Sequence, residues 1–151
     1  MGVEEDRLVT CDPELRRRYE AFFAEWCSTY GTNPRPFVVS ALRTAVEQQE
    51  KKDKGLSDAG PGESLHNYGQ ALDFMFKAEG SKDMIDSDWL YQMAFTILPK
   101  YGLSCGVWIR GKAHDLWLDA GHTQCEGYTW QQAKAGITPD WKPLPKGVGT
   151  C

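Results

Sequence analysis

Hydrophobic side chains recur every three or four residues between Pro13 and Tyr30, and this spacing predicts an amphipathic helix. Asp12 followed by Pro13 is typical of a helix start, and Gly31 is typical of a helix end. The apolar face of this helix is rich in aromatic residues and comprises Leu15, Tyr19, Phe22, Phe23, Trp26 and Tyr30. We therefore expect the helix to pack this face into the core.

Two further helices are predicted later in the chain. Residues 44–54 are polar and favour a helix that ends at Gly55. A third helix is expected to begin at Asp86 or Ser87, to carry apolar residues at helical spacing, and to end at Gly102.

Short apolar segments between these helices predict β-strands, because they are rich in β-branched and aromatic residues or alternate in polarity. The predicted strands cover residues 36–42, 69–76, 103–109 and 119–124. Helices and strands do not alternate regularly, so we expect an α+β fold with a small antiparallel sheet and flanking helices. We expect one domain over residues 1–151, with residues 138–151 as a tail that wraps over the surface.

Composition and charge narrow the classes of function. The chain has 151 residues, 41% of them hydrophobic, and a net charge of −4, which fits a globular protein rather than a disordered one. No long block of basic residues is present, so we expect no nucleic-acid partner. No apolar run approaches the length of a membrane span, so we expect no membrane insertion. We expect a monomer.

Cysteine usage and the amino terminus suggest where the protein folds. The five cysteines are odd in number and form no Cys-x-x-Cys pair, which argues against a disulfide framework and a cysteine zinc cluster. The first residues are polar and acidic, and they lack the basic start and apolar run of a secretory signal. We therefore expect the chain to fold in a reducing cytosol.

Candidate metal ligands stand close together between a glycine-rich loop and a predicted strand. His66 lies at the end of the loop, and Asp73 lies inside the strand between Leu72 and Phe74. A carboxylate in a buried strand is costly unless it is paired or binds a metal. The alternative is that Asp73 pairs with an arginine and His66 is an ordinary loop histidine.

A second cluster adds His122 and Asp119, which lies three residues before it. Three protein ligands would leave a tetrahedral zinc ion one open position, as in catalytic sites. Asp119 could then take a proton from water and hand it to a leaving amine, although it could also simply cap a turn. His114 competes with His122 as the third ligand, but no acid stands three residues before it.

The pattern Ser-x-His-x-x-Gly-x-Ala-x-Asp, followed by Asp-x-x-His, resembles the zinc D-Ala-D-Ala carboxypeptidase and L-alanyl-D-glutamate endopeptidase family. That family includes phage endolysins and belongs with the hedgehog signalling domain to a wider group. The residues that carry the first motif are Ser64, His66, Gly69, Ala71 and Asp73. The resemblance spans about residues 37–124 and implies a Zn²⁺ site on the sheet, held by His66, Asp73 and His122.

The resemblance also extends to an Arg-Thr-x-x-Glu-Gln segment that contains Arg43 and Gln48. It implies that Arg43 stabilises charge on the substrate carbonyl, although Arg43 could equally be a surface arginine at a helix start. Many members have proline before the last histidine and an aromatic residue after it, whereas this chain has Gly121 and Thr123 there. Residues expected to support the ligands or touch substrate are Ser64, Gln48, Trp117 and Gln124.

These observations predict a zinc metallopeptidase that hydrolyses peptidoglycan stem peptide, of the L-alanyl-D-glutamate endopeptidase type found in phage endolysins. The alternatives are a D,D-carboxypeptidase of the same family and a zinc-containing module that binds cell wall or peptide without cleaving it. Because no signal peptide is evident, we expect the protein in the host bacterial cytoplasm before its release to the wall. A virion-associated enzyme would have the same features.

Overall fold

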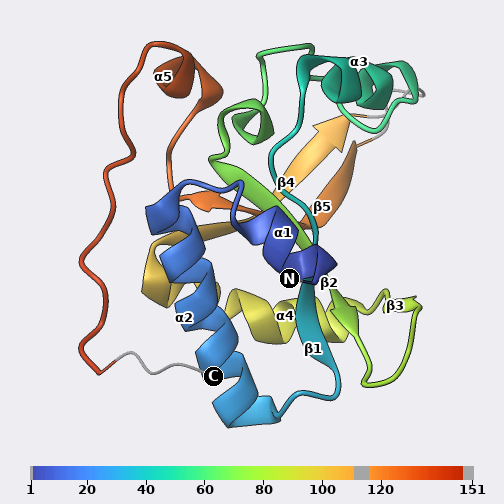
Figure 1. The fold of residues 1–151 in the computed structure, drawn as a ribbon, viewed down its shortest axis with the longest axis vertical. Coiled ribbons are helices and arrows are strands. Elements are labelled where there is room, and N and C mark those ends of the chain that lie inside the picture. The colour runs from blue at the N-terminus through green and yellow to red at the C-terminus, as the bar shows by residue number, and fades with distance from the viewer. Residues whose placement is uncertain (1, 111–115, 148–151) are drawn as a thin grey trace.

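The computed structural model describes residues 2–110 and 116–147, with the side chains at positions 105, 107–110, 116 and 117 left out. The helices are α1 (Val3–Leu8), α2 (Pro13–Tyr30), α3 (Ala45–Asp53), α4 (Asp88–Phe95) and α5 (Trp130–Lys134), with 3₁₀ turns η1 (Leu65–Tyr68) and η2 (Leu98–Tyr101). The strands are β1 (Arg35–Ser40), β2 (Ala71–Lys77), β3 (Met84–Ile85), β4 (Leu103–Arg110) and β5 (Leu116–Cys125). Figure 1 shows their arrangement.

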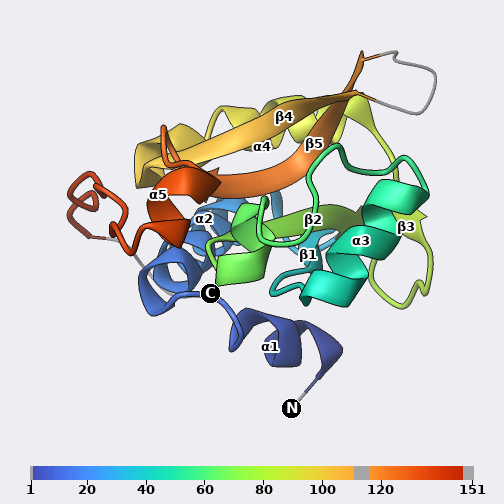
Figure 2. The same cartoon turned by 90° about the horizontal axis from the view of Figure 1, so that it is seen from above.

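The strands form one antiparallel sheet in the order β1-β2-β5-β4. One side of β2 pairs with β1, while its other side pairs first with β5 and then, near its end, with the short strand β3. Helices flank this sheet, so the predicted α+β fold with a small antiparallel sheet is confirmed (Figures 1 and 2).

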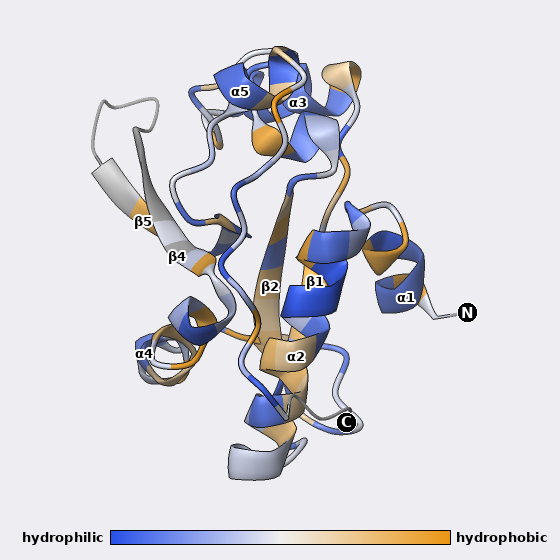
Figure 3. Ribbon diagram, turned by 90° about the vertical axis from the view of Figure 1, so that its left-hand side faces the viewer, coloured by the Kyte–Doolittle hydropathy of each residue, from blue (hydrophilic) through white to orange (hydrophobic). Residues whose placement is uncertain are grey.

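The main core lies between the sheet and helices α2 and α4. Alternate residues of β2 point into it, and the Phe74 ring contacts those of Phe22 on α2 and Tyr91 on α4. Figure 3 shows hydrophobic residues along β2 and both hydrophobic and hydrophilic residues on α2, whereas α3 is mostly hydrophilic. Because side chains of a strand alternate between faces, Asp73 points away from this core.

Helix α2 has the predicted bounds, but the predicted helix from residue 86 to 101 is wrong in its second half. The Asp12 carboxylate accepts hydrogen bonds from the first turn of α2, and Gly31 follows its last residue. Helix α4 ends at Phe95 and a separate turn, η2, follows. Pro99 explains the break, because it lacks the N–H that would bond to the carbonyl of Phe95 and its ring would clash there.

Helix α1 was not predicted from the sequence, and it covers the free edge of β1. The Glu4 carboxylate accepts the backbone N–H of Val38 at 3.0 Å, and the Arg7 guanidinium donates to the carbonyl of Val38 at 2.8 Å. These two side chains satisfy the backbone N–H and C=O of Val38, which would otherwise lie open for pairing with another strand. Helix α5 and strand β3 were also missed, because each is too short to show a periodic pattern.

The segment after α5 runs back along α2 (Figure 1). The buried Arg18 guanidinium on α2 donates to the backbone carbonyls of Tyr101 and Lys142 and lies 4.7 Å from the centre of the Trp141 ring. Arg18 thereby ties the tail to the core.

None of the helices in residues 2–110 and 116–147 is long and apolar enough to cross a membrane.

Candidate metal centre

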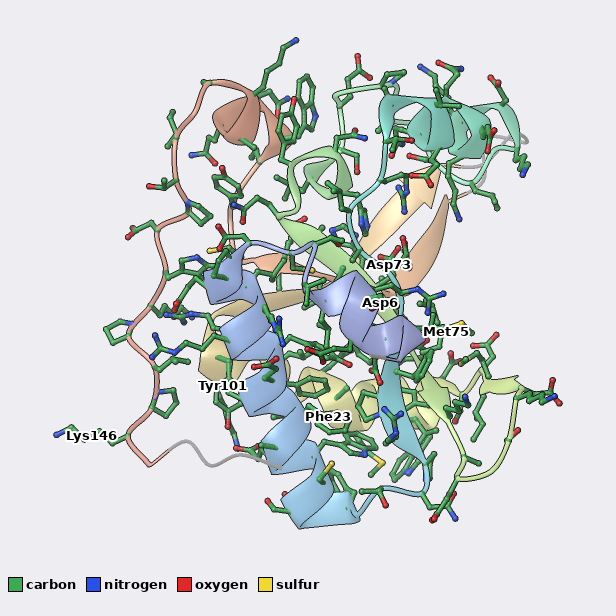
Figure 4. The ribbon with its side chains drawn as sticks, in the orientation of Figure 1. Asp6, Phe23, Asp73, Met75, Tyr101 and Lys146 are labelled. Atoms are coloured by element: carbon green, nitrogen blue, oxygen red, sulfur yellow. The ribbon has the colours of Figure 1, made fainter. Side chains whose placement is uncertain are left out.

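His66, Asp73 and His122 meet on the sheet face opposite the main core. His66 comes from η1, Asp73 from β2 and His122 from β5, and one donor atom of each lies within 4.8 Å of the others. Asp73 lies near the middle of the molecule (Figure 4). His66 and His122 are buried and Asp73 is nearly so. The structure thus brings together the three residues predicted as metal ligands.

His66 is held in place by the turn that follows the glycine-rich loop. Gly69 ends η1 with φ of +68°, and a Cβ added to it would lie 2.9 Å from the carbonyl of Thr10, so glycine fits both the conformation and the space. The His66 Nδ1–H donates to the carbonyl of Ala41 at 2.8 Å, which leaves Nε2 as the free ring nitrogen. That Nε2 atom lies 3.2 Å from Oδ1 of Asp73.

His122 is positioned by strand pairing and by Gln124. In the register of β2 and β5, His122 is the direct partner of Asp73, and its Nδ1 atom lies 3.4 Å from Oδ1 of Asp73. The other ring nitrogen, Nε2, is 2.8 Å from Oε1 of Gln124, and the Gln124 amide donates in turn to the carbonyl of Tyr128 at 2.7 Å. These two hydrogen bonds fix the His122 tautomer in which Nε2 carries the proton and Nδ1 faces the centre.

Gly121 allows β5 to approach β2 closely. A Cβ added to Gly121 would lie 2.1 Å from the carbonyl oxygen of Phe74, which no side chain can tolerate. The hydroxyl of Tyr91 donates to the same carbonyl at 3.2 Å. The absence of a side chain at Gly121 therefore sets how closely the following residue, His122, approaches β2.

The donor set fits a zinc ion. Zinc binds histidine nitrogen and carboxylate oxygen at about 2.0–2.2 Å, so two ligands of a tetrahedral ion lie about 3.3–3.6 Å apart. Oδ1 of Asp73 is 3.2 Å from His66 and 3.4 Å from His122. In both histidines the nitrogen facing away from the centre is hydrogen bonded to an oxygen, as in most histidine ligands. The group can hold a metal, and three protein ligands would leave a tetrahedral ion one further position.

The charges of the centre favour an ionised Asp73. Burial raises the pKa of the Asp73 carboxyl, but the charge of His66 and the hydrogen bonds from both imidazoles outweigh burial and hold this pKa well below its usual value. Burial lowers the pKa of His122, but the hydrogen bond and charge of Asp73 outweigh it and raise that pKa above 6.5. Asp73 thus remains an anionic ligand at neutral pH.

Asp119 lies near the centre because β5 bulges away from β4. Thr123 pairs with Cys105, and Asp119 pairs with Val107. Four residue steps along β5 therefore lie opposite only two along β4. Burial raises the pKa of the Asp119 carboxyl and the negative charge of Asp73 raises it further, while the histidines of the centre partly oppose this. A half-buried carboxyl with a raised pKa beside a metal centre suits proton transfer.

Arg43 lies beside Asp73 and is held by other side chains. Its guanidinium donates to Oε1 of the fully buried Gln48 at 2.9 Å and lies 3.5 Å from Oδ2 of Asp73. Gln48 in turn donates to Ser57 Oγ and the carbonyl of Ala59. Arg43 therefore balances the charge of Asp73 on the side away from the histidines. The role predicted for it on a substrate carbonyl stays a prediction.

The remaining predicted residues fall in different places. Ser64 Oγ accepts the backbone N–H of His66, so Ser64 caps the turn that carries this histidine. The Trp117 side chain and His114 lie outside the part of the chain that the structure describes. Sequence reasoning missed the carbonyl of Ala41 as the partner of His66, since backbone atoms leave no signal in a sequence.

Comparison with known proteins supports the fold. No protein-family model matches the chain, and no curated protein matches its sequence. The crystal structure of the L-Ala D-Glu endopeptidase ChiX of Serratia marcescens is similar, with a TM-score of 0.58 and 18% sequence identity. The match covers 81% of this chain and 85% of that chain. At this level of identity the likeness shows a common fold.

Proposed function

We propose that this protein is a zinc-dependent peptidase that hydrolyses the stem peptide of peptidoglycan at an L-alanyl-D-glutamate bond. The observation that carries the proposal is the convergence of His66 Nε2, Asp73 Oδ1 and His122 Nδ1, each histidine held by a hydrogen bond from its other nitrogen. The fold similarity to an L-Ala D-Glu endopeptidase supports the choice of bond.

Each residue around the centre has a separate role in the proposed hydrolysis. A zinc ion held by His66, Asp73 and His122 would act as a Lewis acid that acidifies water and polarises a carbonyl. Asp119 takes the proton of the attacking water and delivers it to the leaving amine, for which its raised pKa is suited. Arg43, whose planar guanidinium carries several N–H donors, donates to the oxygen that becomes negative as the carbonyl is attacked.

The biological role we propose is that of a phage endolysin-type enzyme. In this proposal the chain is made in the host bacterial cytoplasm and reaches the wall after a separate protein opens the membrane. The Ser-x-His-x-x-Gly-x-Ala-x-Asp pattern at residues 64–73, which resembles a family that includes phage endolysins, supports this role.

The test is release of new amino termini from purified peptidoglycan by zinc-loaded protein, compared with Asp119→Asn at equal zinc content. We expect release by the wild type, with the new terminus identified as D-glutamate, and a loss of about 10²–10⁴-fold in the variant. Asp83→Asn, which removes an exposed carboxylate, serves as the matched control and should retain activity.

Two results would contradict the proposal. Zinc bound at one equivalent without release of amino termini from walls of different peptide composition would favour a binding module. Release of free D-alanine instead of D-glutamate termini would make the enzyme a D,D-carboxypeptidase.

A further inference from the structure

A polar cavity of about 380 Å³ lies between α1, the end of β1 and α3. Figure 2 shows α1 and α3 at the β1 end of the sheet, away from β4. We call it the basic cavity, and its size falls within the usual range of about 300–1,000 Å³ for ligand pockets. Its lining includes residues 39–43, Arg7, Leu56 and the α3 side chains Glu47, Glu50 and Lys51, with Lys54 just after the helix.

The basic cavity and the metal centre share a wall. Ala41 lines the cavity, and its carbonyl accepts the hydrogen bond from His66. Arg43 also lines it, and the Arg43 guanidinium reaches Oδ2 of Asp73. Arg43 thus borders both the basic cavity and the metal centre.

The lining of the basic cavity carries an excess of positive charge, whereas the whole chain has a net negative charge. Four basic residues line it, Arg7, Arg43, Lys51 and Lys54, against Glu47 and Glu50, whereas the protein carries a net charge of −4. The Arg43 guanidinium is paired with Asp73, which leaves three basic residues against two acidic ones. The Glu47 carboxylate is already engaged, because it accepts the backbone N–H of Thr44 at 2.7 Å to cap α3. The cavity thus has an excess of positive charge.

The two lysines are available to a ligand. Arg7 is bound to the carbonyl of Val38, and Arg43 is bound to Gln48. Within the described parts of the chain, neither Lys51 nor Lys54 forms an ion pair, and both line the cavity. Ammonium groups without an acidic partner beside a substrate site attract an anionic group of the substrate.

We propose that the basic cavity binds a free carboxylate of the peptide substrate on the residue next to the cleaved bond. This inference rests on the proposed function. A glutamyl residue has two carboxyl groups, and only one of them continues the chain, so the other is either a free carboxylate or a capped amide. The basic cavity would distinguish these two forms, because only the carboxylate carries a charge at neutral pH.

The test uses two synthetic peptides, L-alanyl-D-glutamyl-lysine with the second glutamyl carboxyl either free or converted to a primary amide. Their affinities are measured by calorimetry with zinc-loaded Asp119→Asn, so that cleavage does not interfere. We expect the free acid to bind about tenfold more tightly than the amide, and this preference to shrink as salt is raised.

Matched substitutions assign the preference to the basic cavity. Lys51→Gln with Lys54→Gln, introduced into the same background, should abolish the preference for the free acid. Lys52→Gln removes the same charge from the same helix, but Lys52 does not line the cavity, so the preference should remain. Equal affinity of the two peptides, or a preference that survives the double substitution, would overturn the inference.

Two further measurements separate the outcomes. A preference for the free acid without any hydrolysis by the wild type would support the cavity assignment while contradicting the proposed function. Tight binding of a poly(glycerol phosphate) polymer, lost in the double variant, together with equal binding of the two peptides would assign the cavity to a polyanion instead and overturn the inference.

Discussion

Nδ1 of His122 lies 3.4 Å from Oδ1 of Asp73, and the two residues are direct partners across β5 and β2. Strand pairing therefore sets the spacing between two of the three candidate ligands. Because the backbone of a sheet is held by hydrogen bonds on both sides, this part of the centre is formed before any ion binds. Features that adjust the pairing should therefore alter metal binding.

Replacing Gly121 by alanine should displace β5 from β2. The new methyl group would meet the Phe74 carbonyl at 2.1 Å, so we expect a loss of about 1–3 kcal/mol in the free energy of unfolding and weaker zinc binding. Denaturant unfolding and zinc titration measure the two effects. Gly2→Ala, which meets no atom within 4 Å and lies outside the left-handed region like Gly121, controls for the exchange of glycine for alanine without a clash and should leave zinc affinity unchanged.

Gln124→Ala should weaken zinc binding without removing a ligand. Its Oε1 accepts the Nε2–H of His122, and loss of such a partner costs about 10- to 100-fold in metal affinity. Competition with a chromophoric chelator measures the affinity. Gln131→Ala, an exposed residue on α5, is the control, and equal zinc affinity in both variants would show that Gln124 does not orient the histidine.

Zinc affinity should fall as the pH is lowered through the raised pKa of His122. Asp73 raises the pKa of His122 above 6.5, so zinc must displace a proton from this ring at and below that pKa. We expect up to about tenfold weaker binding per pH unit there. Calorimetry in buffers of different ionisation enthalpy, at pH 6 and pH 8, should detect more proton release at pH 6. Equal affinity and equal proton release at both values would contradict the assignment of His122 as a ligand.

Asp119→Asn should make the metal-free protein more stable at neutral pH, although it removes the proposed base. Burial and the charge of Asp73 raise the pKa of Asp119 in the folded state, so the folded protein binds this proton more tightly than the unfolded chain. Stability therefore falls as pH rises from the usual aspartate pKa of 3.8 through the raised folded value, and the penalty persists above it. The neutral amide avoids this cost.

Thermal unfolding of metal-free protein at pH 7 and near pH 4 measures this effect. We expect a higher Tm for Asp119→Asn at pH 7 and a smaller difference near pH 4. The control Asp83→Asn, at an exposed position, should change neither value. A lower Tm for Asp119→Asn at pH 7 would mean that the ionised carboxylate stabilises the fold and is not held for proton transfer.

The sequence by itself determined the elements that depend on local patterns. Helix α2 has its predicted start at Pro13 and its stop at Gly31, since the cap, the proline and the period of its apolar face all act within a few residues. The pair His66 and Asp73 was also recognisable, because a short turn and one strand separate them. The end of α4 at Phe95 follows from Pro99, because proline lacks the backbone N–H that a continuous helix would need there.

Only the tertiary structure decided how the distant parts of the centre meet. The register of β2 and β5 brings His122 to Asp73, and the close approach at Gly121 sets the distance between the two strands there. Helix α1 is short and mostly polar, and it gains its place from the contacts of Glu4 and Arg7 with the edge of β1. Such contacts join residues far apart in the chain, so their energy leaves no periodic trace in the sequence and appears only once the sheet has formed.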